Sequence, residues 1–305
     1  MEKFEGLIAA PFAPMNARGE ILYDRIEPYC RFLEKNKVVG AFINGSTGEG
    51  VSLTTAERMK IAEQWAEAAG PGRKITVINL VGGTSQKECI ELARHSAACG
   101  VDAVAVLGPY YFKPAGALPL AEFCARVAEA VPDLPFYFYH IPVLSGCYVP
   151  MFDFLKEAAP RIPNLAGIKY THEDFMDFLS CVHFMEGKFD LLWGRDENLL
   201  SALILGTRAG VGSTYNYAAP LYYRMIAAYD AGEFARARRL QQQSIDMIRL
   251  LGKYGGIATG KAFMRYIGFD FGGFRPPVKN LSEEAYASFA ADVRGLGMED
   301  LFSKR

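Results

Sequence analysis

The sequence lacks an excess of charge of either sign. Its 305 residues include 33 Lys and Arg and 34 Asp and Glu, which leaves a formal net charge of −1. Nucleic acids and anionic membranes attract proteins mainly through a strongly basic surface. The longest apolar runs, such as residues 103–107 and 199–205, are far shorter than the about 20 residues that span a bilayer. We therefore expect small-molecule ligands, with no nucleic acid and no membrane as partner.

The sequence also lacks metal-binding and disulfide motifs. Its six cysteines are scattered, with no C-x-x-C pair and no Cys/His ligand spacing: Cys30, Cys89, Cys99, Cys124, Cys147 and Cys181. Reduced, mostly buried cysteines are typical of a cytosolic protein, and a structural zinc site is not expected. Residues 1–5 do not show the basic and apolar regions of a signal peptide. These features predict a cytoplasmic protein.

Nucleotide-binding motifs are absent as well. No G-x-G-x-x-G opens a helical pattern, and the Gly-Ser-Thr-Gly-Glu stretch at residues 45–49 is not followed by the Gly-Lys-Ser/Thr of a P-loop. Glycines in such a turn let N–H groups and hydroxyls converge on a carboxylate or phosphate. A glycine-rich turn after a strand is also common as plain structure. Ser46 and Thr47 are therefore candidate anion ligands.

Short β-rich runs alternate with helical patterns along the chain, and the helical pattern after residues 38–44 opens with a capping box formed by Thr54 and Glu57. Eight parallel strands, each followed by a helix, are the number that closes an α/β barrel. We predict a (β/α)8 TIM barrel in residues 1–217, with its last helix at about 219–231, and a C-terminal helical extension in residues 232–305. The expected strands are residues 6–10, 38–44, 74–81, 103–107, 135–141, 165–171, 191–194 and 209–213.

Polar residues cluster where these strands end. In a barrel of this kind the chemistry lies at the carboxyl ends of the strands. We expect the following residues to gather there: Ser46, Thr47, Tyr110, Tyr111, Tyr139, Lys169, Thr171, Asp196, Glu197 and Ser213.

Lys169 ends an apolar strand, residues 165–171. Because side chains alternate along a strand, Lys169 and Thr171 share one face, while Ile168 and Tyr170 share the other. Burial lowers the pKa of a lysine from its usual value of about 10.4, and a shift of about three units makes the amine a nucleophile for Schiff-base chemistry. The alternative is a solvated lysine at a strand end.

Tyr139 is the second candidate catalytic residue. The same alternation places Tyr137, Tyr139 and Ile141 on one face of their strand and His140 on the other. A buried tyrosine often makes only a structural hydrogen bond. Beside a Schiff-base lysine, a phenol can alternately donate and accept the protons that carbon–carbon cleavage requires.

Several of these motifs occur together in one known family. Between about residues 6 and 284 the chain resembles the dihydrodipicolinate synthase / N-acetylneuraminate lyase family of pyruvate-dependent class I aldolases. The motifs that carry this resemblance are Gly45-Ser46-Thr47-Gly48-Glu49, Tyr110-Tyr111, Tyr139-His140-Ile141-Pro142, Gly167-Ile168-Lys169, Gly212-Ser213 and Arg275-Pro276-Pro277.

The resemblance implies a role for each matching residue. Lys169 is expected to form the Schiff base with a 2-keto acid, and Tyr139 to act as the proton shuttle. Ser46 and Thr47 are expected to hold the keto-acid carboxylate, and Tyr111 to reach into the site of a neighbouring subunit. The family implies a homotetramer and a reaction that takes no metal or organic cofactor.

The substrate branch should show in residues that contact the far end of the substrate. The synthase branch has an arginine where this chain has Leu144. The sialic acid branch has a threonine two residues after the lysine, a Gly-x-Asp-Glu stretch and a Gly-Ser-Thr-Tyr-Asn stretch, which Thr171, residues 194–197 and residues 212–216 match. The resemblance therefore implies reversible cleavage of N-acetylneuraminate to pyruvate and N-acetylmannosamine.

Five residues are then expected to bind the substrate beyond its pyruvate part: Thr171, Gly194, Asp196, Glu197 and Ser213. Carboxylates and hydroxyls suit a polyol tail. Asp196 and Glu197 are also compatible with an acidic pair that stabilises a helix N-terminus. Arg195 departs from the apolar or aromatic residue expected at its position, which leaves the fine specificity open.

Two alternatives remain from the sequence. One is a related keto-acid aldolase or dehydratase acting on a 2-keto-3-deoxy sugar acid, or the synthase itself. The other is a barrel that binds sialic acid or a keto acid without turning it over.

Overall fold

Eight parallel strands close into a barrel in which each strand pairs with the next in the chain and β8 pairs with β1. The computed structural model describes residues 3–70, 72 and 74–305. This arrangement confirms the expected (β/α)8 barrel. The strands are β1 (Gly6–Ala9), β2 (Gly40–Ile43), β3 (Thr76–Leu80), β4 (Ala103–Leu107), β5 (Phe136–His140), β6 (Leu165–Tyr170), β7 (Asp190–Trp193) and β8 (Ala209–Gly212).

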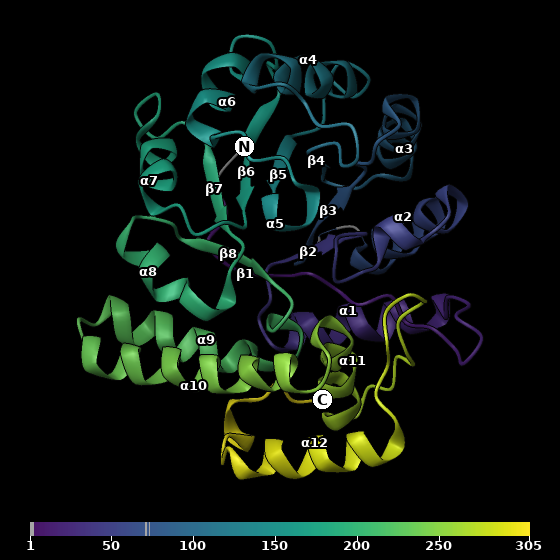
Figure 1. Ribbon diagram of the computed structural model, residues 1–305, viewed down its shortest axis with the longest axis vertical. Helices are drawn as coiled ribbons and strands as arrows, with labels where there is room; N and C mark the ends of the chain where they lie inside the picture. Colours follow the sequence, from purple (N-terminus) through teal and green to yellow (C-terminus); the bar gives the residue numbers. More distant parts are fainter. Residues whose placement is uncertain (1–2, 71, 73) are drawn as a thin grey trace.

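Helices surround the barrel (Figure 1). The predicted capping box at the start of α2 is present, because the Thr54 hydroxyl accepts the N–H of Glu57 while the Glu57 carboxylate accepts the N–H of Thr54. The helices that follow the first seven strands are α1 (Ile26–Lys35), α2 (Thr55–Ala69), α3 (Gln86–Cys99), α4 (Ala117–Ala128), α5 (Pro142–Ser145), α6 (Met151–Ala158), α7 (Phe175–His183) and α8 (Leu199–Ile204).

Helices α5 and α6 both lie between β5 and β6, and the sequence pattern indicates no bounds for them. They have four and eight residues, which is shorter than the 10 to 12 residues over which helical periodicity becomes distinct. The N-terminus of α6 is capped from another helix, because the Asp177 carboxylate accepts the N–H groups of Met151 and Phe152, each at 3.0 Å. No local signal announces a helix whose cap comes from 25 residues away.

The apolar core has two layers that follow the alternation of side chains along the strands. Inward-facing side chains fill the barrel, among them Phe42, Tyr137 and Tyr139. Outward-facing side chains such as Ile168 and Tyr170 pack under the helices. The two predicted faces of β5 and β6 are therefore confirmed.

An irregularity in β6 fixes which residues stand opposite each other. Phe136 pairs with Leu165, but Tyr137 pairs with Gly167, so Ala166 is an extra residue in β6. A bulge of this kind re-aims the side chains that follow it. From there the register places Tyr139 opposite Lys169.

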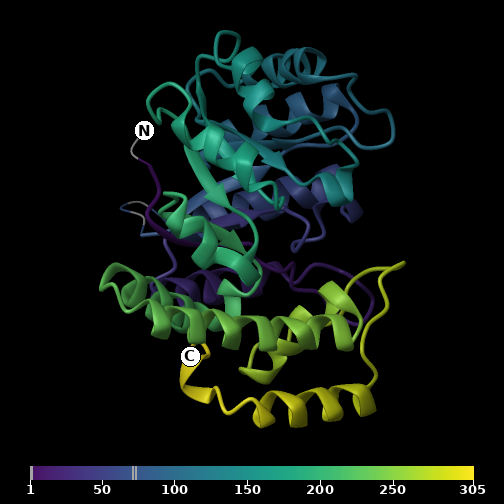
Figure 2. The same ribbon diagram turned by 60° about the vertical axis from the view of Figure 1, so that its left-hand side comes forward.

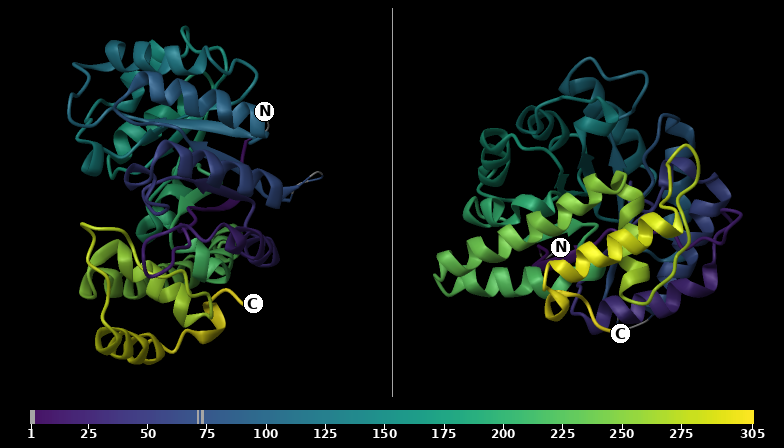
Figure 3. Two further views of the ribbon diagram at one scale, coloured as in Figure 1. Left: turned by 90° about the vertical axis from the view of Figure 1, so that its right-hand side faces the viewer. Right: turned by 60° about the horizontal axis from the view of Figure 1, so that its bottom comes forward.

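The chain after β8 is helical. α9 (Tyr215–Asp230) is kinked at Ala218, and it is followed by α10 (Phe234–Lys253), α11 (Thr259–Tyr266) and α12 (Glu283–Gly295). α9 begins earlier than the expected residue 219. Figures 2 and 3 show α10 lying along one side of the barrel with α12 beyond it. The division into residues 1–217 and 232–305 stays a prediction.

Short 3-10 turns complete the element list: η1 (Tyr23–Arg25), η2 (Gly50–Ser52), η3 (Asp196–Asn198), η4 (Gly256–Ala258) and η5 (Glu299–Leu301). No disulfide joins any of the six cysteines, all of which are described, and Cys99 is half-buried while the other five are buried. In the described part of the chain no helix is both long and apolar enough to cross a bilayer. Of the first five residues, to which the signal-peptide argument applies, 1 and 2 lie outside the described residues.

The close approach of β6 and β7 gives a test of the fold. A Cβ atom at Gly167 would overlap the backbone carbonyl of Asp190. Gly167→Ala should therefore lower the free energy of unfolding by about 1 to 3 kcal/mol or more, because backbone cannot yield as a side chain does. Gly252→Ala in α10, where a Cβ meets no atom within 4 Å, should be neutral or stabilising by up to about 1 kcal/mol. Denaturant titration at one protein concentration measures both, and equal effects would contradict the expectation.

Candidate active site

Lys169 stands at the carboxyl end of the barrel interior. It pairs with Tyr139 of β5 on one side and with Leu192 of β7 on the other. Its side chain is buried, with the residue only 4% exposed. The alternative of a solvated lysine at a strand end is therefore wrong.

Two aromatic rings form the walls around the Lys169 amine. The Nζ atom lies 3.9 Å from the ring centroid of Phe42 and 3.9 Å from that of Tyr139. Ring faces attract a cation, which favours the protonated amine. Burial is the larger effect and lowers the pKa of Lys169 from 10.5 to about 7, although the nearby Asp196 carboxylate opposes it. This change corresponds to roughly 5 kcal/mol, and it leaves about half of the amines neutral at pH 7.

Tyr139 is buried in the same place, with its ring 5.4 Å from that of Phe42 in an edge-to-face arrangement. Burial raises the pKa of Tyr139 to about 12, while the side chains of Ser46 and Thr171 act in the opposite direction. The phenol is therefore protonated at neutral pH. It can donate a proton to a reacting group and recover it later.

Asp196 is the acidic residue whose negative charge raises the pKa of Lys169. Its carboxylate accepts hydrogen bonds from the Thr214 N–H at 2.9 Å and the Thr214 hydroxyl at 2.6 Å. Burial raises the pKa of Asp196 to about 6, and the bonds from Thr214 oppose that rise. The carboxylate lies against Gly212, where any Cβ atom would overlap it.

A chain of polar contacts continues from Asp196 into the C-terminal helices. The Thr214 hydroxyl lies 2.7 Å from that of Tyr222, which lies 2.9 Å from the Ser244 hydroxyl of α10. The side chain of Gln241, also on α10, donates to the backbone carbonyl of Asp196 at 3.1 Å. Asp196 is therefore held directly by Thr214 and by α10, and indirectly by Tyr222 of α9.

The buried Thr171 hydroxyl has no partner with good hydrogen-bond geometry among the described residues, although it lies close enough to the Tyr139 phenol to lower the pKa of that group. Buried polar atoms almost always have a partner, so an unpaired one at a reactive mouth suits a ligand hydroxyl or carboxylate. Gly194 leaves room for this side chain, since a Cβ atom there would overlap the Thr171 hydroxyl. The structure thus brings Thr171 and Gly194 together.

The loop at residues 45–49 follows β2 and carries two further candidates. Ser46 is half-buried and Thr47 is buried. Their N–H groups make no hydrogen bond to any described residue, while the loop is closed by Glu49 N–H donating to the Ser46 carbonyl at 3.2 Å. Free N–H groups beside hydroxyls are the donors that a carboxylate needs.

The outer rim carries a small ion-pair cluster. Arg195 bonds the Glu197 carboxylate at 3.1 Å and lies 3.3 Å from that of Glu173. Glu197 is therefore engaged with Arg195, and it lies within η3, directly before the start of α8 at Leu199. Ser213 is half-buried next to Thr214, the residue that holds Asp196.

Tyr111 is exposed, whereas the other predicted site residues are buried or half-buried. It is 83% exposed, with a left-handed φ of 74°, and its ring packs edge-to-face on that of the equally exposed Phe112. Its neighbour Tyr110 is half-buried and packs against the inner core. The structure therefore separates the two tyrosines.

Sequence reasoning missed two residues of the site. Phe42 supplies one wall of the amine pocket, and Thr214 holds Asp196. Phe42 could have been found from its inward position in β2, since it alternates with the outward-facing Ala41 and Ile43. Thr214 lies within the Gly-Ser-Thr-Tyr-Asn stretch, but nothing in the sequence assigns it a partner.

Among residues 3–70, 72 and 74–305, no three or more His, Cys, Asp or Glu side chains are grouped so that they could hold a metal ion. His140, buried against Tyr170 and His172, has a pKa lowered to about 3 by burial.

The titration of Lys169 gives a testable pH profile. Only the neutral amine attacks a carbonyl, so kcat/KM should fall about tenfold per pH unit below a pKa near 7 and level off above it. Asp196→Asn removes a charge that raises the pKa of Lys169, so the acid limb should move to lower pH. Borohydride trapping of pyruvate at a series of pH values measures both profiles. An acid limb that stays at the same pH in Asp196→Asn would contradict the assignment of this limb to Lys169.

Comparison with known proteins places this geometry in a family. Residues 3–296 match the model of the dihydrodipicolinate synthetase family. The chain is 38% identical to N-acetylneuraminate lyase of Rattus norvegicus, with 97% of this chain and 93% of the relative covered, and 38% identical to that of Gallus gallus, with 98% of each covered.

Solved structures agree with the sequence comparison. Proteus mirabilis N-acetylneuraminate lyase superposes with a TM-score of 0.93 at 37% identity, covering 97% of this chain and 99% of its own. The N-acetylneuraminate lyase (sialic acid aldolase) of Aliivibrio salmonicida superposes with a TM-score of 0.94 at 36% identity, covering 97% and 98%. Family model, sequence relatives and structures coincide over nearly the whole chain, and the chain therefore belongs to the dihydrodipicolinate synthetase family.

Proposed function

We propose that this chain is a class I aldolase that reversibly cleaves N-acetylneuraminate to pyruvate and N-acetylmannosamine. The observation that carries the proposal is the Lys169 amine, buried between Phe42 and Tyr139 with a pKa of about 7. The relatives of about 38% identity that are named N-acetylneuraminate lyase support this choice of substrate.

Schiff-base formation is the first stage of the proposed reaction. The neutral Lys169 amine attacks the C2 ketone to give a carbinolamine. Tyr139 donates its proton to the carbinolamine hydroxyl, which leaves as water, so that an iminium and a phenolate remain side by side. The iminium then withdraws electrons from the C3–C4 bond.

Cleavage and release follow from the same pair. The Tyr139 phenolate takes the proton of the C4 hydroxyl as the C3–C4 bond breaks, which gives the aldehyde of N-acetylmannosamine and an enamine on Lys169. Tyr139 returns the proton to C3, and hydrolysis of the iminium frees pyruvate. The protein-derived iminium is the electron sink, so we propose a reaction that takes neither a metal nor an organic cofactor.

Substrate binding is proposed to involve both sides of the mouth. The N–H groups and hydroxyls of Ser46 and Thr47 are suited to the carboxylate of the keto acid. Thr171, Asp196, Glu197 and Ser213, with the space left by Gly194, are proposed to bind the hydroxyl-rich remainder. The unpaired Thr171 hydroxyl supports this assignment.

We also propose a homotetramer in which Tyr111 completes the site of a neighbouring subunit. The two exposed aromatic rings of Tyr111 and Phe112 support an interface at this loop, since large apolar side chains are seldom left in water together. A cytoplasmic location is supported by the lack of a disulfide among the six cysteines, all of which are described.

Borohydride trapping tests the chemistry directly. Reduction in the presence of pyruvate should add one pyruvate-derived group to Lys169, as read by peptide mass spectrometry, and Lys169→Met should abolish both labelling and turnover. Pyruvate release from N-acetylneuraminate should exceed that from 2-keto-3-deoxygluconate, and condensation of pyruvate with aspartate semialdehyde should be slow. Labelling at another lysine would refute the mechanism, while binding of sialic acid without pyruvate release would indicate a non-catalytic barrel.

The proposed role of Tyr111 can be tested with two variants, one that removes its phenolic hydroxyl and one that disrupts the oligomer. Tyr111→Phe should keep the oligomer and lower kcat by about 10- to 100-fold, because it removes only the phenolic hydroxyl from a proton relay. Phe112→Glu should dissociate the oligomer and lower kcat as a consequence. Sedimentation velocity and steady-state kinetics measure the two effects. A fully active monomer would contradict the shared site.

A further inference from the structure

Glu49, at the end of the 45–49 loop, is joined to the C-terminal extension by a buried ion pair. Its Oε1 atom accepts a hydrogen bond from the Lys261 amine of α11 at 2.9 Å, and its Oε2 atom accepts the N–H of Arg275 at 2.8 Å. The side chains of Glu49 and Lys261 are 4% and 2% exposed. Both carboxylate oxygens are therefore bonded to residues more than 200 positions away in the chain.

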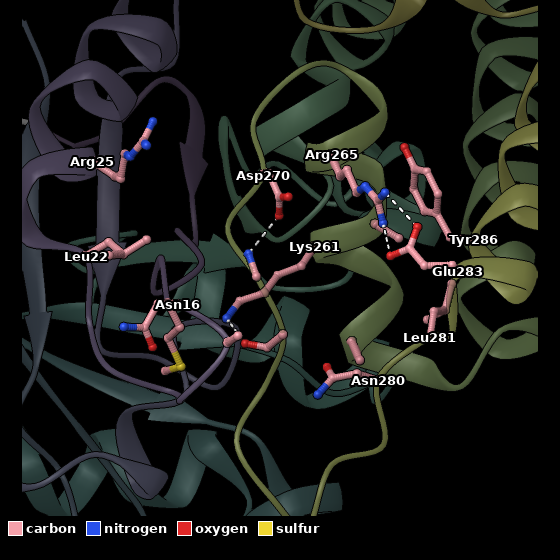
Figure 4. Close-up of a pocket in the computed structure, with 16 residues that line it drawn as sticks. Asn16, Leu22, Arg25, Lys261, Arg265, Asp270, Asn280, Leu281, Glu283 and Tyr286 are labelled. Atoms are coloured by element: carbon pink, nitrogen blue, oxygen red, sulfur yellow. Dashed lines mark hydrogen bonds and ion pairs between the residues drawn. The ribbon is translucent and has the colours of Figure 1, made fainter.

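Lys261 is held at this point from several sides. Its amine also donates to the Gly273 carbonyl at 2.6 Å and lies 4.8 Å from the ring centroid of Phe274. Lys261 lines a cleft of about 500 Å³. Figure 4 shows it between Asn16 on one side and Arg265 on the other. Burial lowers the pKa of Lys261, and the Glu49 charge opposes that shift.

The backbone of Glu49 is in an uncommon conformation. Its φ of 59° and ψ of 22° are left-handed, which costs a residue other than glycine roughly 1 to 2 kcal/mol. Glycine would fit this conformation without that cost. A glutamate persists here because its carboxylate is fixed by Lys261 and Arg275, so the ion pair and the turn depend on each other.

The turn at Glu49 determines where the preceding residues lie. The Glu49 N–H donates to the Ser46 carbonyl at 3.2 Å, and the Gly50 N–H donates to the Gly45 carbonyl at 3.1 Å. A Cβ atom at Gly50 would overlap the Asn44 carbonyl, so the loop has little room on its inner side. A shift in the position of Glu49 would therefore also move Ser46.

Arg275 fixes the same segment to the start of α2. Its guanidinium bonds the Glu57 carboxylate at 2.8 Å and the Gly19 carbonyl at 2.7 Å. The pKa of Glu57 is lowered to about 2, chiefly by this arginine. Figure 1 shows the segment between α11 and α12 running beside α1 and α2. The 45–49 loop is thus fixed to the extension through two residues, Lys261 and Arg275.

We propose that Lys261 is a positioning residue for the reaction, which acts through Glu49 to hold the N–H groups of Ser46 and Thr47 where they meet the carboxylate of the keto acid. This inference rests on the proposed Schiff-base function. It assigns the C-terminal extension a part in binding pyruvate, although Lys261 itself does not contact the substrate.

A purely structural ion pair would behave differently from a positioning one. Its loss would lower stability, but the folded enzyme would bind pyruvate as before. A positioning pair must change the pyruvate concentration that half-saturates the site, even in protein that is fully folded. A misplacement of about 1 Å in a binding group is enough to lower reactivity by about 100-fold.

Lys261→Met tests the inference in the full-length oligomer. The pyruvate concentration giving half-maximal borohydride trapping on Lys169 should rise by about 10- to 100-fold, whereas trapping at saturating pyruvate and the pH profile of Lys169 should change little. Lys253→Met is the matched control, since it removes a lysine of the same extension that pairs with Asp292 at the surface. It should leave the half-saturating concentration unchanged.

A second pair of variants separates stability from binding. Glu49→Gln keeps the shape of the side chain and should also raise the half-saturating pyruvate concentration. The double variant Glu49→Gln/Lys261→Met leaves no unpaired buried charge, so it should melt at a higher temperature than Lys261→Met while its pyruvate binding stays weak. If Lys261→Met does not fold, these two variants carry the test.

Each outcome decides the question. Unchanged half-saturation in folded Lys261→Met or Glu49→Gln would refute the positioning role, as would recovery of pyruvate binding together with stability in the double variant. An equal increase in Lys253→Met would show a general effect of the extension and would also refute it. Failure of the unmodified enzyme to trap pyruvate on Lys169 would instead overturn the proposed function.

Discussion

The proposed chemistry of this protein depends on keeping one amine, that of Lys169, out of water. Lys169 projects into a barrel whose interior is filled by apolar and aromatic side chains, and its Nζ atom is enclosed by the rings of Phe42 and Tyr139. Desolvation makes the ammonium form costly, so the amine becomes neutral near physiological pH. Asp196 limits this effect, because its negative charge favours the protonated form. The proposed reactivity of Lys169 is thus set by the balance between burial, which lowers its pKa, and one carboxylate, which raises it.

Both sides of this site are held from outside the barrel. On one side, Gln241 and Ser244 of α10 contact the backbone of Asp196, and Tyr222 of α9 contacts the threonine that binds its carboxylate. On the other side, Lys261 of α11 holds the end of the 45–49 loop through Glu49. Strands place the reacting groups, while the C-terminal helices fix the residues that surround them. The extension is therefore better described as part of the site's support than as an appendage.

Sequence reasoning succeeded where the relevant information is local. The eight-strand alternation, the faces of β5 and β6 and the capping box of α2 all follow from side-chain period or from residues three apart. Lys169 was found because a charge at the end of an apolar strand is conspicuous. The period of two also predicted that Tyr139 faces the same interior.

The sequence could not show contacts between distant residues. α6 depends on a cap from Asp177, and Asp196 depends on Thr214, 18 residues later. The extra residue Ala166, which aligns Tyr139 with Lys169, arises from strand pairing and leaves no mark in composition. The role of Glu49 was the hardest to predict from the sequence. A glutamate in a glycine-rich turn is usually solvated, and only the structure shows that Lys261 of α11 pairs with it.

The pairing of Glu49 with Lys261 has a consequence for the order in which the protein matures. During translation Glu49 is synthesised long before Lys261, because 212 positions separate them in the chain. Until Lys261 has been added, the Glu49 carboxylate lacks its counter-ion and carries an uncompensated negative charge. Full affinity for the keto acid would then come only after α11 has been synthesised, later than the strands that carry Tyr139 and Lys169.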